Sequence, residues 1–391
     1  MNLFLSGNKF PEIGQAVRIL HVIDHLDVGG AQVLLQNLCV GQTAIDKTVT
    51  QEIVALYGEG SYAASLRRAG ISVTSLAATK TKLVTILRGL RAVLHKGKYD
   101  LLDLHLPVAS VFGTLLSPWQ KRPRTIVNVH ALKAQIPAPF FYQFRLIASR
   151  VDRFVVFLPN SQHDLRTIGI GESKICFIPM GLDFRRAAPE RHREIKCQLA
   201  TQYHFDIAQP LLLSVARLAA DRQIHVLVEA MARIAAVRPD AILLMVGEGD
   251  ARAQLETIVK ANGIERNVIF AGKRLDGWNL FPGCDVYLSM CGGCRIGVAA
   301  FEAMACERAV VAHNIDPMER GECVCREQGV FIAARDADTM AQAVLNLLGD
   351  PNRAQRLGRQ ARENVLRQLS LEAMVRRYNA LYRELVGGTA V

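Results

Sequence analysis

The stretch VRILHVIDHLDVGGAQVLLQNLCVGQ (residues 17–42) contains three kinds of local pattern in succession. Residues 17–24 are mostly apolar, which is typical of a short strand buried on both faces of a sheet. Residues 25–32 contain two adjacent glycines and are predicted to form a turn. The remainder, 31–42, has the apolar spacing of a helix. A buried strand, a glycine turn and a helix in this order indicate an α/β fold with a parallel sheet.

The same order of strand, turn and helix repeats along the chain in two series. Further strands are expected in the first series at 49–57, 71–77, 99–107, 124–131, 152–161 and 174–183, and in the second at 210–218, 241–249, 267–273, 285–290 and 308–314. The polar segment 185–208 between the two series is interpreted as a linker with a short helix. We therefore predict two doubly wound domains, 1–185 and 186–370, with ligands in a cleft at the carboxyl ends of their strands.

Composition excludes several classes of protein. With 50% hydrophobic and 21% charged residues, the 391-residue chain has a globular profile. Its apolar runs are too short for a transmembrane helix, and no secretory signal is expected at the N-terminus. The nine scattered cysteines do not suggest a disulfide framework, so a reduced, cytoplasmic location is expected. The net charge of +11 suits phosphorylated ligands or an anionic membrane. No nucleic-acid motif accompanies this charge, so nucleic acid is not expected as a partner.

Several segments, in order, carry a family resemblance: HVIDHLDVGGAQ, LSVARL, LLMVGEGDARAQLE, NVIFAGK, DVYLS, FEAMACERAVVA and the terminal SLEAMVRRYNALYREL. Together they resemble the GT-B-fold retaining glycosyltransferases of family 4 over nearly the whole chain. The resemblance implies two Rossmann-like domains facing a cleft and a C-terminal helix, 371–391, that packs back on the first domain. It also implies transfer of a sugar from a nucleotide donor, with retention of configuration and without a metal or other cofactor.

Two arginines after the first strand of the second half are the candidates for binding the donor diphosphate. The resemblance implies this role for Arg217 and for position 222, where the family usually has Lys and this chain has Arg222. Two guanidinium groups can neutralise a diphosphate and stabilise it as a leaving group. Gln223 stands where the family commonly has glycine, and Arg222 has an alternative interpretation as a surface charge.

Two glycine turns are candidates for contact with phosphate or nucleotide. Gly29 and Gly30 lie between a strand and a helix, where backbone N–H groups can approach an anion. Gly247 and Gly249 follow a buried strand of the second half, and the resemblance places this turn near the nucleotide. A plain tight turn is the alternative interpretation of both.

The segment MCGGCRIGVAAFEAMAC (290–306) keeps one family feature and loses another. Glu302 matches the carboxylate that, by resemblance, binds the ribose hydroxyls, and a carboxylate suits a diol. Eight positions earlier the family has another glutamate, in a Glu-Gly-Phe-Gly motif. Here Cys294, Arg295 and Ile296 replace its first three residues, and only Gly297 remains. Cysteine cannot reproduce a carboxylate, so a catalytically impaired homologue acting as a binding or scaffold protein stays an alternative, as does a sugar-nucleotide epimerase.

Histidines follow two of the buried strands in the first half. By resemblance, a histidine near His130 contacts the sugar or the acceptor, so His130 is a candidate catalytic residue. His105 occupies a similar position one strand earlier. A histidine satisfied at the end of a strand is the alternative for each.

Cysteine spacing raises a separate hypothesis of a metal site. Cys291, Cys294, Cys323 and Cys325 form two close pairs, which could provide four thiolates for zinc. Thiols packed in a loop are the simpler interpretation, and no metal ligand is predicted among them.

The segment 80–98 carries six basic residues and no acidic one, opposite an apolar face at helical spacing. Such a helix can rest on anionic lipid or be merely solvated.

From the motifs together, we predict a glycosyltransferase that uses a nucleotide-sugar, expected to be UDP-linked, and a saccharide or lipid-linked saccharide acceptor. Peripheral contact with the inner face of the membrane would suit such an acceptor.

Overall fold

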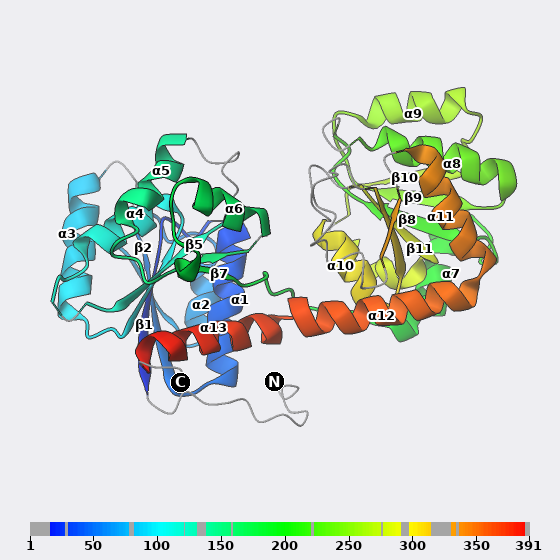
Figure 1. The fold of residues 1–391 in the computed structure, drawn as a ribbon. Helices are drawn as coiled ribbons and strands as arrows, with labels where there is room; N and C mark the ends of the chain where they lie inside the picture. Colours follow the sequence, from blue (N-terminus) through cyan, green and yellow to red (C-terminus); the bar gives the residue numbers. More distant parts are fainter. Residues whose placement is uncertain are drawn as a thin grey trace. The chain divides into compact units, whose positions relative to one another are not determined.

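The computed structural model describes residues 16–27, 30–77, 82–120, 122–130, 138–157, 159–219, 223–274, 277–290, 297–313, 330–333 and 336–387. By its internal contacts the chain divides into two units (Figure 1). Unit 1 combines Met1–Leu182 with Gln368–Val391, and unit 2 is Asp183–Arg367. These divisions fall close to residues 185 and 370, where the sequence suggested domain boundaries.

Unit 1 contains a seven-stranded sheet of order β3-β2-β1-β4-β5-β6-β7, in which every neighbouring pair is parallel. The order reverses between β1 and β4, as in a doubly wound fold, so the switch point lies between these two strands. The strands are Val17–Ile23 (β1), Val49–Ala55 (β2), Ser72–Ser75 (β3), Leu101–His105 (β4), Arg124–Val129 (β5), Arg153–Val156 (β6) and Ile175–Phe177 (β7).

Helices cover both faces of this sheet, because alternate strand residues point to opposite sides. Leu20 and Val22 of β1 pack with α3, α4, α5 and α6, whereas Val17 and Ile19 pack with α1 and α13. Helix α2 joins α1 in a smaller cluster. The helices of unit 1 are Gly30–Ile45 (α1), Ala63–Arg68 (α2), Leu83–Lys96 (α3), Pro107–Leu116 (α4), Ala138–Ile147 (α5), Pro159–Thr167 (α6) and Leu371–Val386 (α13), with a short 3-10 turn at Glu172–Lys174.

Unit 2 repeats the same topology with a six-stranded parallel sheet of order β10-β9-β8-β11-β12-β13. Its switch point lies between β8 and β11. One face of the sheet packs against α8, α9 and α11. The strands are Leu211–Val215 (β8), Ile242–Val246 (β9), Val268–Gly272 (β10), Val286–Met290 (β11), Ala309–His313 (β12) and Val330–Ala333 (β13). The helices are His192–Tyr203 (α7), His225–Val237 (α8), Arg252–Ala261 (α9), Val298–Ala305 (α10), Ala337–Gly349 (α11) and Pro351–Leu369 (α12), with 3-10 turns at Pro189–Arg191, Gly277–Asn279 and Phe281–Gly283.

The segment interpreted from sequence as a linker contains a helix that belongs to the core of unit 2. Helix α7 buries Ile195 and Leu199, and both approach Gly283 so closely that a Cβ there would lie within 3 Å of each. The irregular linker is therefore shorter than expected, because the apolar residues of 192–203 share one helical face.

The last helix completes unit 1. Ser370 caps α13 by accepting a hydrogen bond from the backbone N–H of Ala373. Met374, Val375, Tyr378 and Tyr382 are all fully buried in the cluster beneath β1, β4 and β5. The backbone of Leu182 also forms hydrogen bonds with Leu369 and Leu371. The point where the chain leaves unit 1 is therefore joined to the point where it returns.

No helix within the described ranges combines the length and the apolar character that crossing a bilayer requires.

Candidate functional site

In unit 2, the backbone around Arg217 is fixed by the turn that follows β9. Ala216 N–H donates to Val246 O, and Leu218 N–H donates to Glu248 O, so the residues on both sides of Arg217 are tied to this turn. The Arg217 side chain is exposed. Because Arg217 follows β8, it lies at the carboxyl edge of the sheet beside the switch point, where ligands bind in doubly wound folds.

Gly247 and Gly249 allow this close pairing. A Cβ on Gly247 would lie 1.9 Å from Ala216 O, and one on Gly249 would lie 2.1 Å from Leu218 O. Gly247 also has φ of 145°, which L-residues rarely adopt. Within the unit, the two glycines therefore position the backbone of the Arg217 segment, whether or not they touch a nucleotide.

Glu302 lies on α10, the helix that follows β11 on the other side of the switch point. The helix begins after Gly297, and no described atom lies within 4 Å of where a Cβ on Gly297 would be. The Glu302 side chain is half-buried, and burial raises the pKa of its carboxyl group. Within the described part of the chain, no hydrogen bond or ion pair engages this carboxylate.

The two strands at the switch point of unit 2, β8 and β11, pair over only part of their length. These strands pair only at Leu212 with Val286 and at Leu213 with Tyr287. Beyond that point the buried Tyr287 hydroxyl contacts the backbone N and O of Val215, at 3.3 and 3.2 Å. Toward the carboxyl ends of β8 and β11, the Tyr287 hydroxyl thus takes the place of the backbone hydrogen bonds that would otherwise join the two strands.

Several residues predicted from sequence lie outside the described ranges: Gly29, Arg222, Cys291, Cys294, Cys323 and Cys325. Gln223, next to Arg222, is described and has a left-handed φ of 50°. Glycine would adopt this conformation without strain, and the family commonly has glycine at this position.

In unit 1, the equivalent edge lies between β1 and β4. Gly30 is the first residue of α1, and no described atom lies within 4 Å of where its Cβ would be. Its lack of a side chain therefore has no steric cause among the described residues, unlike that of Gly247 and Gly249. The open N-terminus of α1 is suited to an anion.

The helix after β4 has an unusual start. Leu106 has φ of 73° and ψ of 158°, a region populated almost only by glycine, and its side chain does not cap α4. Asp24, from the end of β1, provides the cap instead: its Oδ1 accepts a hydrogen bond from Ala109 N–H at 2.7 Å. Burial raises the pKa of Asp24 from 3.8 to about 6, although backbone hydrogen bonds oppose this shift. Asp24 was not among the residues predicted from sequence. The only signal for it there is that a carboxylate follows a buried strand and precedes a glycine turn.

His130 and His105 lie together, but they are not equally accessible. His130 is half-buried, whereas His105 is fully buried, and their Nε2 and Nδ1 atoms are 3.3 Å apart. Burial lowers the pKa of His130 to about 3 and the pKa of His105 well below its ordinary value, so both rings are neutral at pH 7. Of the two candidates, His130 is the one that can meet a ligand, and His105 supports it from inside the core.

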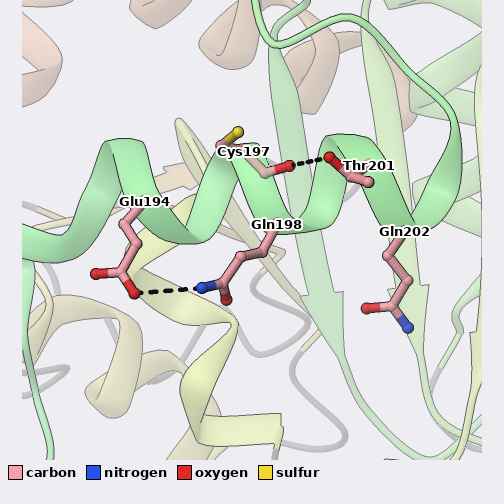
Figure 2. Close-up of a pocket in the computed structure, with 5 residues that line it drawn as sticks. All are labelled: Glu194, Cys197, Gln198, Thr201 and Gln202. Carbon is pink, nitrogen blue, oxygen red and sulfur yellow. Dashed lines mark hydrogen bonds between the residues drawn. The ribbon is translucent and has the colours of Figure 1, made fainter.

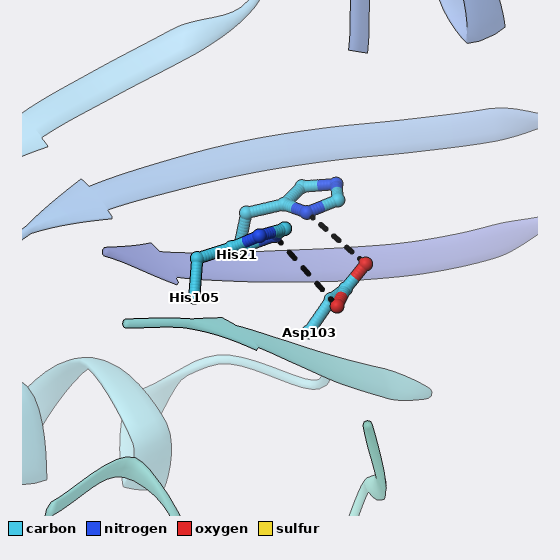
Figure 3. Close-up of side chains that lie close together, drawn as sticks. All are labelled: His21, Asp103 and His105. Atoms are coloured by element: carbon cyan, nitrogen blue, oxygen red, sulfur yellow. Dashed lines mark ion pairs between the residues drawn. The ribbon is translucent and has the colours of Figure 1, made fainter. Parts of the chain in front are cut away.

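Behind His105, a buried polar cluster extends beneath α1 and α13. His21 of β1 and Asp103 of β4 are also fully buried, and Figure 3 shows the two histidine rings turned toward the carboxylate. Tyr382 donates to Asp103 Oδ2 at 2.6 Å. Desolvation raises the pKa of Asp103 to about 7. Sequence reasoning missed this cluster, although an aspartate inside the buried strand LLDLH was a visible signal.

A hollow of about 530 Å³ lies along α7 (Figure 2). Glu194, Cys197, Gln198, Thr201 and Gln202 line it, and all five are exposed residues of one helix face. Two of them are joined by a hydrogen bond from Gln198 Nε2 to Glu194 Oε1. None of the candidate residues lines this hollow, and all of its lining residues come from α7.

The two doubly wound sheets define a protein of the GT-B glycosyltransferase fold, and solved structures agree. The crystal structure of Anabaena HepE in complex with UDP has a TM-score of 0.76 at 18% identity, and the alignment covers 93% of this chain and 99% of that one. A glycosyltransferase from Rickettsia africae has a TM-score of 0.75 at 19% identity, covering 96% and 100% of the two chains.

Sequence comparison identifies the family. Residues 28–186 match the model of Glycosyltransferase Family 4, and residues 200–364 match that of Glycosyl transferases group 1. The chain therefore belongs to the group 1, family 4 glycosyltransferases, as its motifs indicated.

Curated relatives from bacteria are similar over parts of their length. A GDP-mannose-dependent mannosyltransferase of Corynebacterium glutamicum, which acts on a monoacylated phosphatidylinositol monomannoside, is 26% identical over 247 residues, 56% of this chain and 64% of that protein. The N-acetyl-α-D-glucosaminyl L-malate synthase of Bacillus anthracis is 25% identical, over 48% of this chain and 49% of the enzyme. The matches thus span between about half and just under two thirds of these two relatives. An N-acetylgalactosaminyltransferase of Campylobacter jejuni acting on a diphospho-undecaprenol-linked sugar is 21% identical over 86% of this chain and 92% of its own length.

Proposed function

We propose that the protein transfers a sugar from a UDP-linked donor to a saccharide or lipid-linked saccharide, with retention of configuration. The observation that carries this proposal is the arrangement at the switch point of unit 2. The backbone around Arg217, after β8, is tied to the turn that follows β9, and the half-buried carboxylate of Glu302 lies on the helix that follows β11. A cation for the diphosphate and an acceptor for the ribose diol are the two groups that a nucleotide-sugar requires.

The chemistry follows from these charges. Arg217 would neutralise the negative charge that develops on the departing diphosphate, which is usually the largest contribution to such a transfer. The N-terminus of α10 provides a positive dipole end. With these groups the leaving group needs no metal ion, so none is proposed for the transfer step. His130 is proposed to contact the sugar or the acceptor from unit 1.

The decisive measurement is calorimetric titration of the protein with UDP, GDP and UDP-sugars. UDP is expected to bind, and Glu302→Ala is expected to weaken it at least about tenfold, since each hydrogen bond to a charged group contributes about 1.5–3 kcal/mol. Glu265→Ala, at an exposed position between α9 and β10, is the matched control and should bind like wild type. If no nucleotide binds to folded protein, the enzymatic function is wrong.

The affinity for UDP should also depend on pH in a way that reports Glu302. Its carboxylate accepts both ribose hydroxyls only when ionised, and burial raises its pKa above the ordinary 4.5. As pH falls, the affinity for UDP should therefore begin to decline at a higher pH than the pH at which an exposed glutamate becomes protonated. The same titration with Glu302→Gln should lack this decline.

One residue favours the alternative of a catalytically impaired homologue, namely Cys294 in place of the family's glutamate. Acceptor-dependent release of UDP separates the two functions. A protein that binds UDP but releases none from UDP-sugars with any saccharide acceptor would be a binding or scaffold protein. Conversion of a UDP-sugar without any acceptor would instead identify an epimerase.

Two further proposals concern location. The five cysteines in the described ranges have free thiols, which supports a reduced, cytoplasmic setting. At the start of α3, Leu83 and Val84 are 47% and 62% exposed beside Lys82, and Arg88 and Arg91 are exposed further along the helix. This combination supports peripheral contact with anionic membrane. Co-sedimentation with phosphatidylglycerol vesicles, lost at high salt and in Leu83→Glu, would test it; salt-independent binding or none would contradict it.

A further inference from the structure

The buried cluster of His21, Asp103 and His105 brings three potential metal ligands together from two strands. His21 on β1 is in register with Asp103 on β4, and His105 lies two residues further on β4, so all three side chains share one face of the sheet. One potential ligand atom from each residue lies within 4.8 Å of those of the other two. All three residues are 0% exposed.

The tautomer of His21 is set by its neighbours. Gln51 Nε2 donates to Cys39 O and to Thr43 Oγ1, both at 3.0 Å, which fixes the orientation of the Gln51 amide. Gln51 Oε1 is then an acceptor, and it lies 3.2 Å from His21 Nε2. His21 therefore carries its proton on Nε2. Its Nδ1 is left as a bare lone pair that finds no hydrogen-bond partner among the described residues.

His105 Nε2, like His21 Nδ1, is buried without a hydrogen-bond partner in the described part of the chain. Its other nitrogen, Nδ1, lies 3.3 Å from His130 Nε2. When Nδ1–H donates to His130, the Nε2 atom presents a second lone pair toward Asp103.

Two hydrogen-bond donors hold the Asp103 carboxylate in its orientation toward the two histidines. Asn128 Nδ2 donates to its Oδ1, and the Tyr382 hydroxyl donates to its Oδ2 at 2.6 Å. A buried carboxylate that faces two imidazole lone pairs is unfavourable unless a proton or a metal cation lies between them. The gaps are 3.5 Å from His21 Nδ1 to Oδ2 and 3.7 Å from His105 Nε2 to Oδ1, longer than good hydrogen bonds.

We propose that His21, Asp103 and His105 bind a structural divalent metal ion of the zinc class inside unit 1. Ligand atoms around a tetrahedral zinc with bonds of about 2.0–2.1 Å are separated by about 3.3 Å, close to both gaps. A single proton can bridge only one of the gaps, whereas an ion contacts all three ligands at once. Two imidazoles and a carboxylate are established zinc ligands.

The surrounding groups match those that accompany metal ligands. In metal sites the second histidine nitrogen donates to a protein acceptor and the ligating carboxylate is itself hydrogen-bonded. Here Gln51 accepts from His21, His130 can accept from His105, and Asn128 and Tyr382 donate to Asp103. Because Tyr382 lies on α13, the ion would also link the sheet to the C-terminal helix. Full burial assigns it a structural role, separate from the transfer step.

The test is the metal content of the full-length protein, produced without a histidine tag in zinc-supplemented medium and measured by mass spectrometry. We expect about one equivalent of Zn²⁺ per chain. Asp103→Asn and His21→Gln should lose most of it, whereas His95→Gln, the same substitution at an exposed helix position, should keep it. The double variant Cys291→Ser/Cys294→Ser should also keep it, which separates this site from a thiolate site.

A second measurement uses wild type alone, so it tests the proposal even if the variants fail to fold. Protein unfolded in denaturant is refolded with EDTA, with Zn²⁺ or with Co²⁺, and its thermal unfolding and visible absorption are recorded. Zn²⁺ should raise Tm by several degrees over EDTA, and Co²⁺ should give the absorption of a nitrogen- and oxygen-ligated ion. Wild type without zinc and with the same Tm in all three buffers would overturn the proposal. Retention of zinc in folded Asp103→Asn, or its loss in the cysteine variant, would overturn it as well.

Discussion

At the scale of single residues, the glycines of the candidate sites fall into two groups with different physical causes. Gly247 and Gly249 are required by the protein itself, because a Cβ on either would overlap a backbone carbonyl of the Arg217 segment. Gly30 is the first residue of α1 and Gly297 directly precedes α10, and no described atom lies within 4 Å of where a Cβ on either would be. Sequence reasoning treated these residues alike, since a glycine after a strand looks the same whichever cause applies.

We predict that Gly249→Ala destabilises unit 2 by more than about 2 kcal/mol, because its Cβ would lie 2.1 Å from Leu218 O and the backbone must move. The shift should also displace Arg217 and weaken UDP binding. Chemical denaturation and calorimetry measure the two effects. Gly349→Ala, also in unit 2, is the control for the loss of a glycine alone, because Gly349, like Gly249, has no left-handed φ but has nothing within 4 Å of its added Cβ. Equal losses in both variants would show that the close contact is unimportant.

Asp24 gives a prediction about pH. Its carboxyl group ionises near 3.8 when unfolded and near 6 when folded, so the folded state holds the extra proton between these values. The stability of wild type should therefore fall as pH rises from about 4 to about 6. Asp24→Asn keeps an oxygen acceptor for Ala109 N–H and cannot ionise. The variant should be more stable by about 1–3 kcal/mol at pH 8 and equal to wild type near pH 4.

Denaturant unfolding of both proteins across this pH range measures the difference. Asp27→Asn, at an exposed position in the same loop, controls for the change of charge alone. A stability difference at Asp24 that does not vary with pH would contradict the burial argument.

At the scale of elements, α13 packs its apolar face into the interior of unit 1. Its hydroxyl groups reach across the sheet face: Tyr378 donates to Asn128 Oδ1 and Tyr382 to Asp103 Oδ2, both at 2.6 Å. The helix itself was predictable from its apolar spacing and its Ser370 cap. These hydrogen bonds were not, because they join residues more than 200 positions apart, and no local pattern encodes such a pairing.

We predict that Tyr382→Phe costs about 1–3 kcal/mol, since it leaves a buried carboxylate without one donor. Tyr142→Phe, at an exposed position on α5, should change stability by less than about 0.5 kcal/mol. Thermal and denaturant unfolding compare the two. A Tyr382→Phe variant as stable as the control would mean that Asp103 is satisfied in some other way.

At the scale of the whole molecule, the two parallel sheets followed from their strands, which are short, apolar and separated by turns, and the family fold was correctly predicted. What the sequence did not reveal depends on contacts across the sheet. His105 looked like a cleft residue because it ends a strand, but the face it occupies is covered by α1 and α13. Asp24 and Leu106 act together only because β1 and β4 are neighbours at the switch point.

The division of the chain predicts how a truncated protein behaves. Removing 371–391 deletes α13 and uncovers the face formed by Val17, Ile19, Leu101 and Ile126. Unit 1 should then lose its protection from hydrogen exchange, while the sheet of unit 2 keeps its own. Removing only 388–391, beyond the helix, is the control and should change neither. Loss of protection in both units would show that they do not fold separately.

The arrangement of the units has a consequence during synthesis on the ribosome. Unit 2 is a continuous segment set between the two parts of unit 1, so its last residue emerges while α13 is still in the exit tunnel or not yet made. The nascent chain must hold the first 182 residues without their closing helix, with Asp103 and Asn128 lacking the tyrosines that satisfy them. The part translated first is thus completed last, and over that interval its apolar face around Val17 and Ile19 stays uncovered.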